Sequence, residues 1–197
     1  MKKILPIICF LILSSFSVED KVPGKDIVER NGLFYKINSD QPFTGISEEY
    51  SGRDYYKRTF KDGEQVEIET SYVGRKGLTK TGVTKLKDGL IRESKSYNLI
   101  TGKLTDVMRF DKTGSFHGIQ ETYHENGQLE CKDIKDKGED TFSECYYPNG
   151  LLEYKGLYGD DYFLEIEYNE EGEVETKFCY TKEGSKKVKS SFCSDLQ

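Results

Sequence analysis

The sequence predicts an all-β protein built as an elongated antiparallel β-meander of stacked hairpins. Along residues 52–184, glycines recur at intervals of 11 to 14 residues, with one doubled interval of 22. Aromatic and branched residues fill the segments between them, and no segment has a sustained helical period. Turn residues at such intervals are typical of short strands joined by tight turns. The glycines of this series are Gly52, Gly63, Gly77, Gly89, Gly102, Gly114, Gly127, Gly138, Gly150, Gly172 and Gly184.

The N-terminal segment, residues 1–17, has the pattern of a secretory signal peptide. It opens with two lysines, continues with the apolar run 4–13, and ends with the small residues Ser15 and Ser17. The apolar run is too short to span a bilayer as a helix. We therefore expect cleavage before Val18.

The single cysteine of this segment is not expected to carry a lipid. Ile8 precedes Cys9 where a lipid-modified cysteine requires a small residue, and Pro6 stands where an aliphatic residue is expected. The sequence thus predicts an exported protein, periplasmic or extracellular, that is not a lipoprotein.

Residues 18–197 are predicted to form a single β-hairpin repeat domain. Two of the 29 basic residues fall in the signal peptide, so with 35 acidic residues the mature chain has a net charge of −8. This charge disfavours nucleic acid as a partner and also disfavours anionic membrane surfaces. A mean hydropathy of −0.70 fits a thin, mostly solvated sheet.

The first clear repeat region is residues 27–63. Segment 26–30 predicts a strand, the Asn-Gly pair at 31–32 a two-residue turn, and segment 33–37 the return strand. Asn and Gly both tolerate the positive φ angles that such a hairpin turn needs. A second strand pair is expected around the turn at 61–63.

The second clear repeat region is residues 118–184, after a degenerate, strand-rich stretch over 64–117. Segments 123–127, 146–150 and 168–172 each contain an aromatic residue, three mostly polar residues and a glycine, at offsets of 23 and 22. One repeat is therefore predicted to be a strand, a turn, a return strand and a second turn.

Alternation assigns faces in the last hairpin when its strands are reflected through Gly172. One face is expected to pair Leu164, Ile166 and Tyr168 with Tyr180, Phe178 and Thr176. The opposite, solvated face is expected to carry Glu165, Glu167, Glu175 and Lys177.

Four cysteines remain after cleavage, and an even number in an exported chain favours disulfides. Both pairs, Cys131 with Cys145 and Cys179 with Cys193, have a separation of 14. A hairpin folded about Gly138 would place the first pair directly opposite each other, and the second pair flanks a turn-like run in the same way. Four reduced thiols are the alternative if the chain is not exported.

No residue pattern points to catalysis, and we expect no cofactor and no metal. His117 and His124 are the only histidines, and their odd separation places them on opposite faces of a regular strand. They are interpreted as surface residues. The many carboxylates are interpreted as a solvated face that keeps an open sheet soluble.

Tyrosines are the candidate interaction residues, because a tyrosine ring buries area while its hydroxyl stays hydrogen-bonded. Adjacent tyrosines on a strand must place one ring on each face. The alternative is that the rings only cover the core of the sheet. The candidates are Tyr55, Tyr56, Tyr123, Tyr146 and Tyr147.

Residues 118–129 (GIQETYHENGQL) resemble the core of MORN-variant repeats, and residues 31–35 (NGLFY) with 42–45 (PFTG) look like the start of bacterial exported proteins that carry them. Some of these proteins are labelled antitoxin-like. The resemblance implies a sheet of stacked hairpins and no catalytic residues. The chain departs from the pattern in having no tryptophan, and in having Thr122 and Cys145 where the first of two aromatic residues is usual.

Together these features predict a non-enzymatic, exported interaction module that binds an unidentified protein partner. The hypothesis depends on exposed aromatic residues, free edge strands and the absence of catalytic motifs. Binding to a membrane surface and antitoxin- or immunity-like binding of a toxin are the alternatives.

Overall fold

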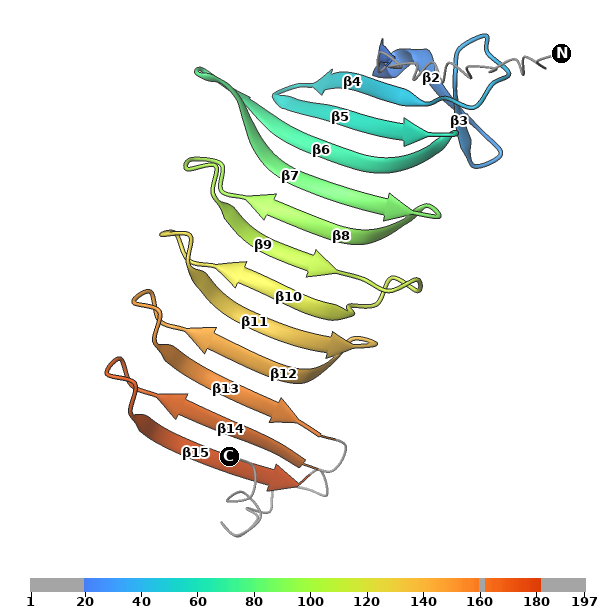
Figure 1. The fold of residues 1–197 in the computed structure, drawn as a ribbon. Helices are drawn as coiled ribbons and strands as arrows, with labels where there is room; N and C mark the ends of the chain where they lie inside the picture. The colour runs from blue at the N-terminus through green and yellow to red at the C-terminus, as the bar shows by residue number, and fades with distance from the viewer. Residues whose placement is uncertain (1–19, 160–161, 182–197) are drawn as a thin grey trace, which may run out of the picture.

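A computed structural model of the protein describes residues 20–159 and 162–181. Thirteen strands form one sheet, and β2 and β3 form a separate two-stranded sheet. From β4 onward each strand is antiparallel to the next, so the sheet is the predicted elongated meander of stacked hairpins (Figure 1). The elements are β1 (Lys21–Pro23), the 3-10 turn η1 (Gly24–Asp26), β2 (Ile27–Arg30), β3 (Leu33–Lys36), β4 (Gly45–Ser51), β5 (Asp54–Lys61), β6 (Glu64–Gly74), β7 (Gly77–Lys87), β8 (Leu90–Tyr97), β9 (Leu104–Arg109), β10 (Gly118–Tyr123), β11 (Leu129–Asp136), β12 (Glu139–Tyr146), β13 (Leu152–Tyr158), β14 (Tyr162–Tyr168) and β15 (Val174–Thr181).

The predicted signal peptide lies outside the described residues. The degenerate stretch 64–117 is strand-rich as predicted, since it contains β6 to β9 and continues the sheet without a break. The region 27–63 differs from the expectation: β2 and β3 leave the main sheet, and only β4 and β5 belong to it.

Two-residue turns close six hairpins of the described strands, and in four of them both turn residues have positive φ angles. At Asn31 and Gly32 both φ angles are positive, 53° and 80°, as the Asn-Gly pair predicts for a primed turn. The pairs Asp62-Gly63, Asp88-Gly89 and Lys137-Gly138 follow the same rule.

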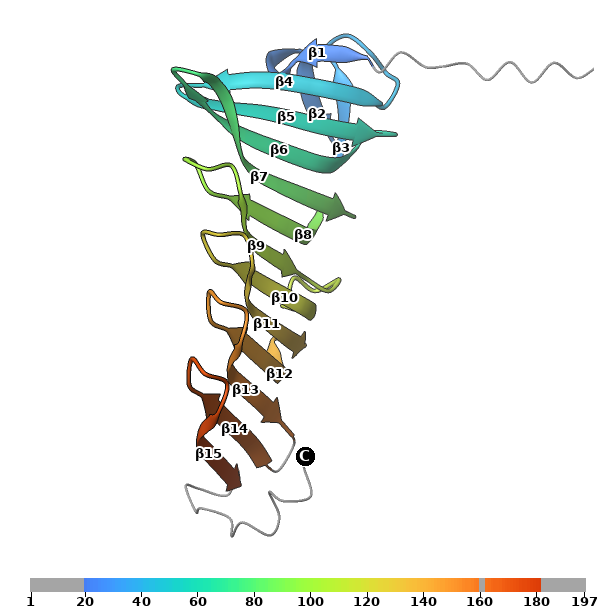
Figure 2. The ribbon, with the colours of Figure 1, turned by 60° about the vertical axis from the view of Figure 1, so that its left-hand side comes forward.

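The recurring five-residue motif forms longer loops on one edge of the sheet. In the loop 124–128, the Gly127 N–H donates to the His124 carbonyl at 2.8 Å. The loops 147–151 and 169–173 close by the equivalent bond. Seen from the side, these loops stack in a column along the edge (Figure 2).

Side chains connect each stacked loop to the next. The Asn126 amide donates to the Pro148 carbonyl at 2.9 Å, and the Asn149 amide donates to the Glu170 carbonyl at 3.3 Å. Each asparagine also accepts an N–H of its own loop through its side-chain oxygen. Loops that are one repeat of 22 or 23 residues apart in the sequence are therefore neighbours in space and are joined by hydrogen bonds.

The N-terminal hairpin covers the first strands of the main sheet. The Phe34 and Phe43 rings pack on Phe60, with ring centroids 5.0 and 5.5 Å apart. At the sheet edge, β1 pairs with β4 for three residues only and ends at Pro23. A short edge strand that ends in proline limits further strand pairing.

Buried side chains are few, as expected for a single-layer sheet. Phe43 and Phe60 pack together under the N-terminal hairpin, and Leu164 with Cys179 forms a small cluster between β14 and β15.

The predicted register of the last hairpin is wrong by one residue. Leu164 pairs with Cys179, and Ile166 pairs with Lys177. The turn is centred one residue before Gly172, which alone would shift the pairing by two residues. A bulge opposite Glu167 and Tyr168 reduces this shift to one residue. A slip of one residue exchanges the faces of a strand. Phe178 and Thr176 therefore join the face of Glu165 and Glu167, and Lys177 joins the face of Leu164.

Candidate functional site

Cross-strand pairing defines two faces at the C-terminal half of the sheet. One face carries a row of successive cross-strand partners on β11 to β14, namely Cys131, Cys145, Tyr154 and Glu167. We call this face the groove face. The opposite face carries the neighbouring row of partners Glu121, Lys132, Glu144, Lys155 and Ile166, and is here the ion-pair face.

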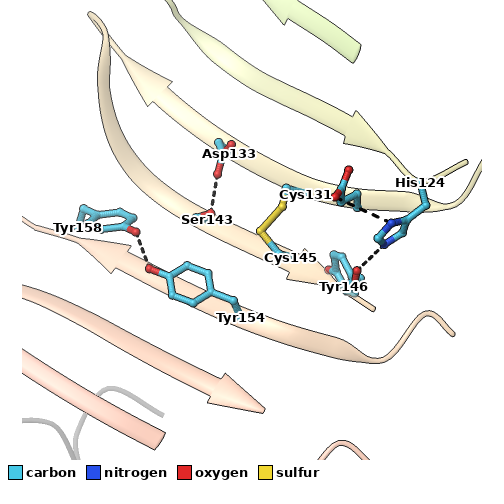
Figure 3. Close-up of a disulfide and its surroundings, with 9 residues drawn as sticks. His124, Cys131, Asp133, Ser143, Cys145, Tyr146, Tyr154 and Tyr158 are labelled. Atoms are coloured by element: carbon cyan, nitrogen blue, oxygen red, sulfur yellow. Dashed lines mark hydrogen bonds and ion pairs between the residues drawn. A yellow bond between two sulfur atoms is a disulfide. The ribbon is translucent and has the colours of Figure 1, made fainter. Parts of the chain in front are cut away.

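The predicted disulfide between Cys131 and Cys145 is confirmed and lies on the groove face, with Cα atoms 4.1 Å apart (Figure 3). The turn at 137–138 alone would offset the two cysteines by one residue. A bulge opposite Ile134, which leaves Thr141 without a partner, corrects the offset. The disulfide fits an oxidising compartment.

The second predicted disulfide stays a prediction. Cys179 is disulfide-bonded, and Cys193 lies outside the described residues.

Three bulges at equivalent positions of the repeat each present a glutamate. Pairing passes from Cys131 to Leu129, and therefore leaves Glu130 without a partner. In the same way Glu153 in β13 and Glu175 in β15 are the extra residues of their bulges. A bulge re-aims the side chain of its extra residue. All three glutamates consequently line the groove described next.

The groove has a volume of about 350 Å³ and lies beside the stacked loops. Its lining is Glu130, Cys131, Cys145, Tyr147, Glu153, Tyr154, Glu167, Tyr168 and Glu175. Across the described ranges, no Lys or Arg nitrogen lies within 4 Å of any of its four carboxylates. The basic group seen beside them among residues 20–159 and 162–181 is His124, whose Nδ1 is 4.0 Å from Glu130. The groove thus combines tyrosine rings with unneutralised negative charge.

Hydrogen bonds fix the tyrosines of the groove. The Tyr147 hydroxyl donates to the Tyr168 carbonyl at 2.7 Å. The Tyr154 hydroxyl lies 2.7 Å from the Tyr158 hydroxyl and donates to Glu165 at 3.0 Å. The Tyr154 and Tyr158 rings both lie over Gly156, where a Cβ would clash with their hydroxyl oxygens. The ring positions are therefore set before any ligand arrives.

The environment of the groove raises the pKa of two of its tyrosines, Tyr147 and Tyr154. Burial raises the pKa of the Tyr147 hydroxyl, and the surrounding carboxylates, including Glu153 and Glu175, raise it further. Burial, followed by the bonds to Tyr158 and Glu165, raises the pKa of Tyr154. Both hydroxyls stay neutral at physiological pH, so the formal charge of the groove comes from its glutamates.

The ion-pair face is organised differently, since its glutamates have basic partners. Glu93 lies within 4 Å of Lys85, Lys95 and Arg109. Arg109 also pairs with Glu121 at 3.0 Å. Further along the sheet, Glu144 pairs with Lys155 at 3.9 Å.

The predicted tyrosines do not gather on one surface. Only Tyr147 lines the groove. Tyr123 and Tyr146 are half-buried and interact with Glu121 and Glu144 of the ion-pair face. The last two candidates lie at the N-terminal end, where Tyr55 is 8% exposed and Tyr56 is half-buried against the guanidinium of Arg58.

The interpretation of both histidines as surface residues is correct only for His117, which is half exposed beside Asp136. His124 has a side chain that is 15% exposed, and its Nε2 lies 2.6 Å from the Tyr146 carbonyl, so it bridges two repeats. No three His, Cys, Asp or Glu side chains in the described part of the chain are arranged to hold a metal ion. Over the same part, no helix has the length and apolar character needed to cross a membrane.

The sequence contains a signal for the groove that the predicted tyrosines do not include. Residues 129–132 (LECK), 152–155 (LEYK) and 174–177 (VETK) repeat a branched residue, glutamate, a variable residue and lysine. The glutamate is the bulged residue of the groove face, and the lysine falls on the ion-pair face.

Comparison with known proteins adds no identification. No protein-family model matches the sequence, and the search of curated proteins finds no similar sequence. The resemblance to MORN-variant repeats therefore stays a prediction.

Proposed function

We propose that the chain is a non-enzymatic interaction module that is exported to the periplasm or the cell exterior and docks a basic segment of a protein partner in its groove. The observation that carries the proposal is the set of four groove carboxylates without a Lys or Arg partner among the described residues. Carboxylates left unpaired on a sheet repel one another, and a cationic ligand removes that repulsion.

The tyrosines of the groove favour the same ligand. The hydroxyls of Tyr147 and Tyr154 are already hydrogen-bonded, so these rings offer fixed aromatic surface at low entropic cost. Lys and Arg side chains interact favourably with such rings as well as with carboxylates. An anionic membrane surface, the first alternative, would be repelled by this groove. Binding of a toxin is a narrower form of the proposal and requires a toxin with a basic surface segment.

The test measures binding of a fluorescein-labelled octalysine peptide by fluorescence anisotropy at low and at physiological salt. The groove variant carries Glu130→Gln, Glu153→Gln and Glu175→Gln. A matched control removes three other exposed glutamates that do not line the groove, by Glu29→Gln, Glu64→Gln and Glu139→Gln.

Both variants lose the same net charge, so a general electrostatic attraction would weaken equally in both. We expect the groove variant to lose at least about tenfold in affinity and the control to lose less than about threefold. Equal losses, or no binding by the unmodified protein, would refute the proposal.

A further inference from the structure

The spacing of the bulged glutamates carries information about the partner, provided that the proposed docking of a basic segment is correct. Glu130, Glu153 and Glu175 lie on β11, β13 and β15, which are alternate strands of the sheet. Neighbouring strands are about 4.8 Å apart, so these glutamates recur about every 9.6 Å across the strands. A ligand that engages all three must present cations at this interval.

Regular peptide conformations differ in whether they meet this interval. A polyproline II helix rises about 3.1 Å per residue with three residues per turn, so every third side chain lies on the same side, about 9.3 Å further on. An extended β-strand repeats a face about every 6.8 Å. An α-helix rises about 5.4 Å per turn, and its same-face residues seven apart are about 10.5 Å from one another. The polyproline II interval is the closest match.

The aromatic lining supports the same conformation. Tyr147 and Tyr168 lie between the glutamate-bearing bulges, on the segments that follow β12 and end β14. Aromatic-lined grooves bind polyproline II segments because that helix is extended and needs little ordering on binding. The fixed hydroxyl of Tyr147 keeps its ring in place for such contacts.

We infer that the groove recognises a basic peptide segment in polyproline II conformation, which crosses the strands and presents a Lys or Arg at every third residue. The cations meet Glu130, Glu153 and Glu175 in turn, and Glu167 of β14 adds negative charge between the last two. The residues between the cations lie against the tyrosine rings.

The test compares two labelled nine-residue peptides of identical composition, three lysines and six prolines, by anisotropy. In the spaced peptide lysine stands at positions 1, 4 and 7, and in the clustered peptide at positions 1, 2 and 3. We expect the spaced peptide to bind at least about fivefold more tightly. Glu153→Gln, which removes the middle carboxylate, should reduce this preference, whereas Glu139→Gln outside the groove should leave it unchanged.

The outcomes separate this inference from the proposed function. Equal affinity of the two peptides, with both lost in the Glu130→Gln, Glu153→Gln, Glu175→Gln variant, would overturn the spacing inference and leave the docking of basic segments intact. Tighter binding of a helical peptide with lysines seven residues apart would also overturn it. Failure of both peptides and of octalysine to bind would overturn the inference and the proposed function together.

Discussion

The two faces of the C-terminal strands carry similar residues but organise their charges in opposite ways. On the ion-pair face, Glu93, Glu121 and Glu144 each have a basic partner within 4 Å. On the groove face, Glu153 and Glu175 have no Lys or Arg partner among the described residues and share a groove. The difference comes from the bulge, because it turns the glutamate of each repeat away from the lysine two residues later.

This separation of charge suits a sheet without a second layer. Cross-strand ion pairs and the small Leu164 cluster stabilise one face. The other face keeps its carboxylates uncompensated at a cost in repulsion, which natural proteins retain mainly where a charge serves binding. The comparison therefore predicts that stability and binding respond to changes on different faces.

Removing the disulfide should have the largest effect on stability. The bond closes a loop across a separation of 14 residues, for which restriction of the unfolded chain contributes about 3 kcal/mol. The double variant Cys131→Ser, Cys145→Ser should lose about this amount, measured by equilibrium urea unfolding. Reductant added to the unmodified protein also breaks the disulfide of Cys179, so it should cost at least as much as the double variant. Equal stability of variant and parent would show that the groove face does not depend on its covalent link.

Charge reversals at residues 153 and 155, which lie on opposite faces, should have smaller effects on stability, and these should differ in sign. Lys155→Glu places a second carboxylate beside Glu144, and should destabilise by about 1 kcal/mol. Glu153→Lys places a cation among the groove carboxylates, and should be neutral or stabilising by about 0.5 kcal/mol. Urea unfolding of both variants checks this, with Lys155→Gln and Glu153→Gln as the charge-removal controls. Destabilisation of equal size on both faces would remove the distinction between them.

The sequence predicts the parts of the fold that depend on local turn chemistry. Positive φ at Asn31 and Gly32 follows from residue types that tolerate it. Spacing alone predicts the Cys131–Cys145 pair. The two cysteines are in register only because of a bulge at Thr141, which the spacing does not reveal.

The bulges themselves could not be located, since their extra residues are ordinary strand residues with no turn signature. The misassigned face of Lys177 is one consequence. The groove is the other, because regular alternation places Glu153 on the face opposite Tyr154, whereas both line the groove. The repeated branched-Glu-x-Lys pattern could have pointed to the glutamates, but only the register shows which face they occupy.

Loss of one link between stacked loops should cost less than about 1 kcal/mol. Asn149→Ala removes the bond to the Glu170 carbonyl and the bond that the side chain accepts from the Leu151 N–H; both groups lie at an exposed loop where water replaces part of the interaction. Asn149→Ser is the comparison variant, because its hydroxyl keeps an acceptor for the Leu151 N–H but is too short to reach the Glu170 carbonyl, and it should cost less than Asn149→Ala. Hydrogen exchange of the Leu151 amide measures the local effect, and unchanged exchange in both variants would contradict the structural role of the loop contacts. Octalysine binding should stay within about twofold, which separates the loop edge from the groove.

The smallest predicted effect is a pH dependence at the centre of the ion-pair face. Burial acts to raise the pKa of Glu93, but the combined effect of Lys85, Lys95 and Arg109 outweighs it and the pKa is lowered from 4.5. A lowered folded-state pKa contributes stability that is fully present above the unfolded value and is lost as the pH falls through the folded value. The carboxylate is partly exposed and screened by solvent, so its contribution is at most about 0.5 kcal/mol. The free energy of unfolding in urea is measured at pH 7 and at pH 3. Between these pH values, Glu93→Gln should lose less stability than the unmodified protein. Glu153→Gln removes no ion pair and should not reduce the loss. An acid-induced loss in Glu93→Gln as large as in the parent would show that the ion pairs of this face add nothing to its stability.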